Sequence, residues 1–363
     1  MLLKDLYSRE FYGEFTGIAK QTLPNFEEKD FFYRIFNNEF DGMELKQRIR
    51  HTAKVLAQFL PQDFRDAMPL LTALSQNVKK SIGKNQSFEY IFLADYIQEF
   101  GVNYFDESMQ AIEVVTQCSS CEFAIRPFLL RYFEKTMKQM QLFALHNDAN
   151  VRRFSSEGSR PRLPWGMGVP SLKQQPETIL PILESLQFDS SEYVRRSVAN
   201  NLNDISKDHQ SLFITTIQKW YNDENLHDIL RHASRTLLKQ GNKEIGQLFG
   251  LKTNVITITD WKVQTPTITI GESVEIDVEI ENTSLETVNA RIEYVLYFLM
   301  KNGEYSKKVF MISKQSIEGK CKKKFTKRHS FKPITTRTYY KGEHKISIQV
   351  NGVESSQQSF ILL

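Results

Sequence analysis

Residues 146–170 read HNDANVRRFSSEGSRPRLPWGMGVP, and residues 188–209 read FDSSEYVRRSVANNLNDISKDH. Each stretch opens with a polar cluster of the kind that caps helices and continues with Val-Arg-Arg. In the second stretch the apolar residues recur at the spacing of one buried helix face: Val194, Val198, Leu202 and Ile205. Two helices with such similar openings predict a repeated helical unit.

Similar openings occur on both sides, at 119–132 (SSCEFAIRPFLLRY) and at 222–237 (NDENLHDILRHASRTL). The cations at equivalent positions are about 27, 43 and 36 residues apart, namely Arg126, Arg153, Arg196 and Arg231 or His232. Helix pairs at this irregular spacing favour HEAT-like repeats over a single compact bundle. Nearer the N-terminus, residues 46–60 carry the apolar stripe of another helix, which Pro61 is expected to end. The many aromatic residues of this part are interpreted as core rather than as a ligand site.

After Gly250 the pattern changes to period two. Segments such as TITIGESVEIDVEIEN and HKISIQVNG alternate apolar with polar residues, and Asn302-Gly303 and Asn351-Gly352 are typical of hairpin turns. Six or seven short strands in about 110 residues predict an antiparallel sandwich. We therefore expect a mainly α chain, with a HEAT-like α-solenoid of stacked helical hairpins over 1–250 and a small all-β immunoglobulin-like sandwich over 251–363.

The net charge of +4 is unevenly distributed. From residue 251 onward there are 17 basic and 12 acidic side chains, and residues 301–345 alone hold 14 basic and three acidic ones. Such a run indicates an anionic partner, although a solvated strand face has the same composition.

The cysteine count argues against a disulfide framework, because three is an odd number. Cys118 and Cys121 form a C-x-x-C that no second pair accompanies; we interpret it as coincidental, with redox or metal use as the alternatives. No apolar run reaches the length of a membrane helix, and the first ten residues lack the apolar core of a signal peptide. We expect a soluble cytoplasmic protein that contains no metal or cofactor.

The loop after the first Val-Arg-Arg helix is dense in charged and aromatic residues. Pro161 and Pro164 prevent a helix from continuing through it, so Glu157 is expected to end the helix and the loop carries Arg160, Arg162 and Trp165. In the second helix, Asp204 falls about 80 to 110° from the centre of the apolar stripe. It can project from the rim of that face towards a neighbouring helix, which allows Glu157, Trp165 and Asp204 to share one cleft.

Structural roles compete with chemical ones here. Arg152 or Arg195 is expected to tie one repeat to the next through a preceding Asp, and Asp208 is interpreted as a surface residue. Trp165 has few apolar neighbours in the sequence, so a partly exposed stacking role and ordinary packing both remain open.

The central motifs carry a specific resemblance. SSEGSRPRLPWGM (155–167) followed by YVRRSVANNLNDISKDH (193–209) resembles the signature of the AlkC-type DNA alkylation repair glycosylases, and CEFAIRPFL (121–129) also fits it. The helical part resembles the HEAT-like catalytic domain of that family. The β-rich part resembles the immunoglobulin-like domain found in one branch of it.

The resemblance implies hydrolysis of the N-glycosidic bond of N-methylated bases, chiefly 3-methyladenine and 3-methylcytosine, in DNA. Such a base is cationic and leaves readily, so carboxylates are needed to stabilise an oxocarbenium-like sugar and to position water. By this resemblance the catalytic residues are Glu157, Asp204 and Glu122. Trp165 is expected to stack on the base or sugar, and Arg153 and Arg160 to hold flanking phosphates.

The expected partner is kinked double-stranded DNA containing alkylated bases, bound by a monomer without a protein partner or membrane. Further DNA contacts are assigned to a group of basic side chains: Arg162, Arg196, Lys322, Lys323, Lys324, Lys327 and Arg328. No Lys is singled out as a Schiff-base nucleophile, so we expect a monofunctional glycosylase without lyase activity. The alternative is a non-catalytic helical-repeat scaffold that binds DNA or protein. Carboxylates on a cationic surface would repel phosphate, so a DNA-binding scaffold gains nothing from them, and their presence favours the glycosylase hypothesis.

Overall fold

The computed structural model of the protein describes residues 2–83 and 85–363. The described chain is helical up to Leu248 and β-stranded from Ile256, as predicted. Its internal contacts divide it into two compact units, of which unit 1 extends to Phe213 and includes Trp220–Ala233, whereas unit 2 contains Ile214–Lys219 and Ser234–Leu363. The domain boundary at residue 250 therefore stays a prediction.

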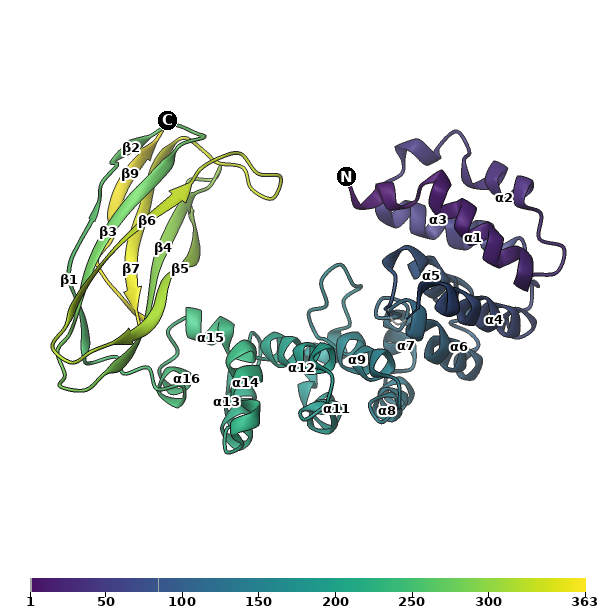
Figure 1. Ribbon diagram of the computed structural model, residues 1–363, viewed down its shortest axis with the longest axis horizontal. Coiled ribbons are helices and arrows are strands. Elements are labelled where there is room, and N and C mark those ends of the chain that lie inside the picture. The colour runs from purple at the N-terminus through teal and green to yellow at the C-terminus, as the bar shows by residue number, and fades with distance from the viewer. Residues whose placement is uncertain (1, 84) are drawn as a thin grey trace. The chain divides into compact units, whose positions relative to one another are not determined.

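Unit 1 is a HEAT-like array in which several helices pack on a helix further along the chain (Figure 1). Thus α3 packs on α5, α4 on α6, α9 on α12 and α12 on α14. The helices of this part of the chain are α1 (Arg9–Thr22), α2 (Glu28–Ile35), α3 (Leu45–Ala57), α4 (Phe64–Ile82), α5 (Ile91–Phe100), α6 (Phe105–Cys118), α7 (Arg126–Arg131), α8 (Phe133–Phe143), α9 (Ala149–Gly158), α10 (Pro170–Gln174), α11 (Leu180–Leu186), α12 (Glu192–Ile205), α13 (Gln210–Trp220) and α14 (His227–Ala233). Of these, α13 belongs mostly to unit 2, which contains Ile214–Lys219. Short 3-10 turns lie at Leu3–Leu6, Phe40–Gly42, Phe88–Tyr90, Pro176–Thr178 and Glu224–Leu226. In the described ranges, no helix is both long enough and apolar enough to cross a membrane.

Aromatic side chains fill the core of the N-terminal hairpins. Phe15, Phe31 and Phe92 are fully buried, and the rings of Phe15 and Phe92 lie 5.1 Å apart edge to face. The apolar stripe predicted over 46–60 is buried as well. The helix itself ends earlier than predicted, at Ala57, and residues 58–60 form a turn before Pro61.

Unit 2 contains a two-layer β-sandwich (Figure 1). One sheet has the order β1-β3-β6, and the other β2-β9-β7-β4-β5, with β8 paired to β7. Its apolar core takes alternate residues of the long strands, such as Val274, Ile276, Val278 and Ile280 of β3. The strands are β1 (Ile256–Val263), β2 (Thr267–Ile268), β3 (Ser273–Asn282), β4 (Val288–Leu299), β5 (Tyr305–Ile317), β6 (Lys322–Ser330), β7 (Gly342–Val350), β8 (Val353–Glu354) and β9 (Gln358–Leu362). The described residues thus form two strands more than the upper prediction, and β2 and β8 are only two residues long.

Two predicted turns and two short helices complete this unit. Asn302-Gly303 connects β4 to β5, and Asn351-Gly352, with φ of 47° and 84°, forms the tight turn from β7 to β8. Helices α15 (Arg235–Lys239) and α16 (Lys243–Leu248) rest on this end of the sheet. Gln349 donates to the carbonyl of Lys239 at 3.1 Å, and a Cβ on Gly241 would lie 2.4 Å from the Gly352 carbonyl oxygen. The backbones touch at this point, so neither glycine tolerates a side chain.

Candidate active site

The first Val-Arg-Arg helix, α9, ends at Gly158, one residue later than predicted. The Asp148 side chain caps its N-terminus by accepting from the amide of Asn150 at 2.7 Å. At the other end, Gly158 packs so closely that a Cβ would lie 2.9 Å from Met140 and 3.0 Å from Ile125. Glu157 therefore occupies the last turn of a helix whose end is fixed by packing.

The second helix, α12, presents a polar face to the end of α9. The Ser197 hydroxyl donates to Glu157 Oε2 at 2.6 Å, and the Asn201 amide donates to the carbonyl of Ser156 at 2.8 Å. Asp204 follows on the same face and projects towards the segment after α9, in the direction that the helical period predicts. Its side chain is buried, however, with only 1% of the residue exposed, instead of lying on a rim.

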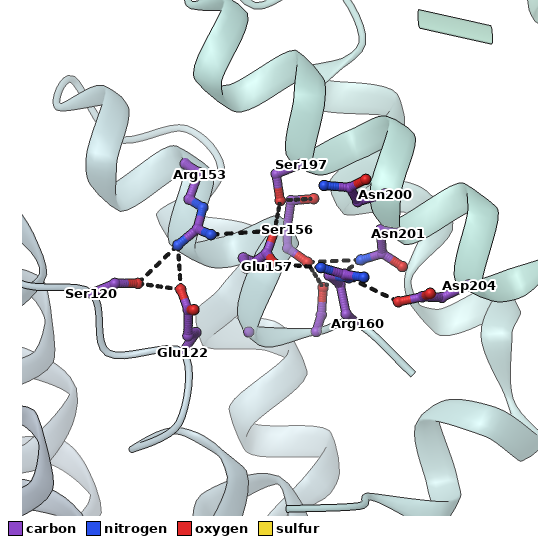
Figure 2. A network of polar contacts seen from close by, with 12 residues as sticks. Ser120, Glu122, Arg153, Ser156, Glu157, Arg160, Ser197, Asn200, Asn201 and Asp204 are labelled. Carbon is purple, nitrogen blue, oxygen red and sulfur yellow. Dashed lines mark hydrogen bonds and ion pairs between the residues drawn. The ribbon is translucent and has the colours of Figure 1, made fainter. Parts of the chain in front are cut away.

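Arg160 joins the carboxylates of the two helices (Figure 2). Its Nη1 donates to Glu157 Oε1 at 2.6 Å, and its Nε donates to Asp204 Oδ2 at 2.8 Å. Lys207 also reaches Asp204, with Nζ 3.0 Å from Oδ1. The two predicted acids are thus held on either side of one buried guanidinium.

Arg153 extends this network to the third predicted acid (Figure 2). Its guanidinium pairs with Glu122, and its Nη2 lies 3.5 Å from Glu157 Oε2. Ser120 donates to Glu122 at 2.5 Å and accepts from Arg153 at 3.0 Å. All three acids therefore belong to one chain of polar contacts with Arg153 of α9 and Arg160 of the segment after it.

Most of this network opens onto one cavity of about 500 Å³. The cavity is lined by Gln86, Ser87, Phe88, Ile91, Ser119, Ser120, Glu122, Phe123, Arg153, Glu157, Arg160, Leu163, Pro164, Trp165 and Tyr193. Asp204 is not among the lining residues, so it is connected to the cavity through Arg160. A hollow of this size, with aromatic walls and a few charged groups, is typical of a small-molecule or nucleoside site.

Trp165 forms an exposed wall of the cavity. The residue is 59% exposed. Its backbone φ is 63°, a value that residues other than glycine and asparagine rarely adopt. Lys46 of α3 fixes this conformation by donating to the Trp165 carbonyl at 2.7 Å. The indole is therefore available to an incoming ligand.

Glu157 is ionised at neutral pH. Burial alone would raise its pKa, but the charges of Arg153 and Arg160 and the hydrogen bond from Ser197 outweigh burial. The net effect lowers the pKa of Glu157 below its ordinary value. The cavity thus presents a carboxylate rather than a carboxylic acid, which suits stabilisation of positive charge and not proton donation.

The C-x-x-C pair has a structural environment. Both thiols are buried, Cys118 donates to the carbonyl of Val115, and burial raises the pKa of Cys118 to about 12. Such thiols are poor nucleophiles. Within the described chain, no group of three or more His, Cys, Asp or Glu side chains is arranged to hold a metal ion.

Comparison with known proteins decides the family. Residues 257–363 match the family model described as the C-terminal Ig-like domain of uncharacterised protein YhaZ. The chain is 39% identical over 352 residues to uncharacterized protein YhaZ of Bacillus subtilis (strain 168), with 96% of each chain covered. Its structure matches Pseudomonas fluorescens alkylpurine DNA glycosylase AlkC, bound to DNA containing an abasic site analog, with a TM-score of 0.92, 31% identity and full coverage of both chains. The chain belongs to the AlkC-type family, in the branch with a C-terminal immunoglobulin-like domain.

The AlkC-type resemblance predicted from two motifs thus extends over both parts of the chain.

The structure also gives several predicted residues contacts that the sequence did not indicate. Arg152 binds Asp189, which follows in the next hairpin, through Nε at 2.5 Å and Nη2 at 3.0 Å. Arg152 thus ties one repeat to the next, but through an Asp that follows it in the sequence and not through the preceding Asp that was predicted. Arg195 instead donates to the carbonyls of Asp189 and Ser190.

Two further predicted DNA contacts of this AlkC-type chain lie outside the cavity. Arg162 forms a two-bond ion pair with Asp208, at 2.8 and 2.6 Å, so Asp208 has a partner. Arg196 lines a separate cavity of about 420 Å³ between α12 and α14, with Glu192 and Asp228. Neither residue joins the network of the three acids in the described contacts.

The basic residues of β6 face an acidic strand. Lys322 and Lys324 lie 3.8 and 3.2 Å from Glu281 and Glu279 of β3, and Arg328 pairs with Glu275. Lys323 and Lys327 occupy the alternate face of β6, where Lys323 donates to Gln315 at 2.9 Å. The acidic residues of β3 therefore neutralise part of the positive charge that β6 contributes to the basic run.

Sequence reasoning missed the polar residues that surround the acids. Ser197, Asn201 and Asp204 are spaced as i, i+4 and i+7, and this polar stripe could have predicted a hydrogen-bonded helix interface. No pattern in the sequence indicated that Lys207 pairs with Asp204 or that Tyr193 lines the cavity. Arg126 occupies the same position in its repeat as the other cations, but it is fully buried and donates to backbone carbonyls of the segment after α9.

Proposed function

We propose that this AlkC-type protein is a monofunctional DNA glycosylase that removes cationic N-methylated bases, 3-methyladenine and 3-methylcytosine, by hydrolysis. The observation that carries the proposal is the single cavity that brings Glu122 and Glu157 next to Trp165 and Arg153. The similar Pseudomonas fluorescens protein, an alkylpurine DNA glycosylase bound to DNA, supports the purine substrate of this proposal, 3-methyladenine.

The chemistry requires little acid catalysis. A methylated base that carries a positive charge leaves as a neutral molecule when the N-glycosidic bond breaks and its electron pair moves to the base. Positive charge then develops on the deoxyribose, and an adjacent carboxylate stabilises it. The oxygen of a water molecule bonds to the anomeric carbon, and its proton passes to a carboxylate and then to solvent. An ionised Glu157 suits both tasks.

We assign the three acids different positions in this reaction. Glu122 and Glu157 line the cavity and would face the sugar. Asp204 is buried behind Arg160, and its contacts support a contribution made through that arginine. Arg160 has two carboxylate partners, so its contacts favour holding the acids over the phosphate contact expected from the family resemblance.

Binding would use the exposed groups around this cavity. Trp165 would stack on the lesion or its sugar, and the Arg153 guanidinium, which lies over the ring of Tyr193 at 4.9 Å, would approach a flanking phosphate. Residues of β6, with Arg162 and Arg196, would contact the backbone of kinked duplex DNA. We propose that the protein acts as a monomer in the cytoplasm.

The test is release of methylated bases from DNA treated with a methylating agent. Replacing Glu157 by Gln keeps the hydrogen-bonding shape and removes the charge, so we expect release to fall by about a hundredfold or more. Asp204→Asn should lower it as well, while both variants still bind DNA. Glu293→Gln is the matched control, because Glu293 is a fully buried carboxylate paired with Arg291 in the sandwich. Equal release by wild type and Glu157→Gln would reject the catalytic assignment, and DNA binding without any release would favour a scaffold.

A further inference from the structure

Arg126 is the largest fully buried side chain of the described protein, with 1% of the residue exposed. It begins α7, directly before Pro127 at the first helical turn. Its guanidinium makes three hydrogen bonds, and all three acceptors are backbone carbonyls. Nη1 donates to Gly158 at 3.0 Å and to Arg160 at 2.9 Å, and Nε donates to Met167 at 2.8 Å.

The charge of Arg126 is balanced by these carbonyls instead of by an acid. In the described part of the chain no carboxylate forms an ion pair with it, whereas Arg152, Arg153, Arg160 and Arg162 each have at least one carboxylate partner. Burial and the nearby Arg160 lower the pKa of Arg126 to about 10, so it stays protonated at neutral pH. Two of its acceptors lie at the C-terminus of α9, where the helix dipole favours a cation.

The three carbonyls enclose the segment that carries the chemistry. Gly158 follows Glu157 directly, Arg160 bridges the acids, and Met167 lies two residues after Trp165. One guanidinium thus joins the start of this segment to its end. A planar group that donates in several fixed directions can do this, and a lysine ammonium cannot reproduce it.

We propose that Arg126 is a positioning residue for base excision, which holds residues 157–167 so that Glu157 and Trp165 face the same cavity. This inference rests on the proposed glycosylase function. Arg126 does not line the cavity, so it acts through the backbone that it holds. Displacement of reacting groups by about 1 Å can cost on the order of a hundredfold in rate.

Two variants, Arg126→Lys and Arg126→Ala, test the proposal in the full-length protein. We expect kcat for release of 3-methyladenine to fall about tenfold in the first and about a hundredfold in the second, with DNA affinity nearly unchanged. Guanidinium ion, at concentrations far below those that unfold the protein, should restore part of the activity of Arg126→Ala. Urea at the same concentration should not.

Arg48→Ala is the matched control. Arg48 is also buried and also donates to two backbone carbonyls, those of Met43 and Lys4, but it does not contact residues 157–167. The control should lose stability and keep its kcat. A loss of kcat as large as that of Arg126→Ala would overturn the proposal, as would unchanged kcat in both Arg126 variants.

Hydrogen exchange separates this inference from the proposed function, because it needs neither DNA nor activity. Amides of residues 158–167 should exchange faster in Arg126→Ala than in the wild type or Arg48→Ala. Unchanged exchange would overturn the role of Arg126 whatever the activity. If the wild type releases no base, the proposed function fails, and the exchange result still decides whether Arg126 fixes the segment.

Discussion

Two regions of this protein are rich in ion pairs, and they differ in burial. Between α9 and α12, Glu157, Arg160 and Asp204 are 5%, 7% and 1% exposed. Between β3 and β6, by contrast, the Arg328 and Lys324 side chains are 75% and 82% exposed. Water screens the β-strand pairs and makes each worth little, whereas the helical pairs are desolvated and depend on one another. Charge density alone therefore does not identify a site, because burial determines which charges affect stability and chemistry.

The largest expected difference between the two regions is the loss of stability when the arginine of an ion pair is replaced, Arg160 in the helical region and Arg328 in the β-stranded one. Arg160→Met leaves two buried carboxylates without their shared partner, so we expect the free energy of unfolding to fall by about 3 kcal/mol or more. Arg328→Met removes an exposed partner of Glu275 and should cost less than about 1 kcal/mol. Urea unfolding of both variants measures the difference. Equal losses would mean that burial does not distinguish the two regions.

A second expected difference concerns DNA. Replacing Lys322, Lys324 and Lys327 by Gln should weaken DNA binding about tenfold or more and reduce the salt dependence, since each lost phosphate contact lowers the slope by about 0.9. The rate of excision at saturating DNA should change little. A control that removes three ion-paired lysines of unit 1, Lys20, Lys54 and Lys135, keeps the charge change equal. Equal weakening in both proteins would show an effect of net charge alone.

The smallest expected difference is in the response of single carboxylates to salt and acid. The pKa of Glu279 is lowered by hydrogen bonds from Thr259 and Lys324 at the surface, whereas that of Glu157 is lowered inside the network, against the effect of burial. High salt should therefore raise the pKa of Glu279 towards its ordinary value and leave that of Glu157 nearly unchanged. NMR titration of the side-chain carboxyl carbons measures both.

The lowered pKa of Glu157 also makes the stability of the protein depend on pH. Because folding lowers the pKa of Glu157, its ionisation stabilises the protein above the ordinary value of 4.5. That contribution is lost as the pH falls below 4.5 through the lower folded pKa. Glu157→Gln should lack this part of the acid sensitivity, and an unchanged pH profile of stability in this variant would contradict the expectation.

In the helical part and in the β-stranded part, local patterns predicted the secondary-structure elements better than the contacts between them. The stripe of Val194, Val198, Leu202 and Ile205 is the buried face of α12, and the Asn-Gly pairs are turns. The contact of Arg160 with Asp204 joins residues 44 positions apart. It depends on how two hairpins stack, which no local period encodes.

The acidic partner of β6 could not be predicted for a similar reason. The alternating acids of β3 are visible in the sequence, but β3 pairs with β6 across two intervening strands that belong to the other sheet. Only this topology sets Glu279 opposite Lys324. The role of Arg126 was missed because its acceptors are backbone carbonyls, which carry no sequence signal.

The contact of Gly241 with Gly352 has a practical consequence for dissecting this protein. A chain cut at residue 250 would separate α15 and α16 from the sheet on which they rest, and it would expose the amide of Gln349 that Lys239 covers. Loss of activity in such a fragment would report damage to a shared surface as much as the missing sandwich. Substitutions on individual strands, with the chain left whole, are the cleaner way to learn what the β-rich part contributes.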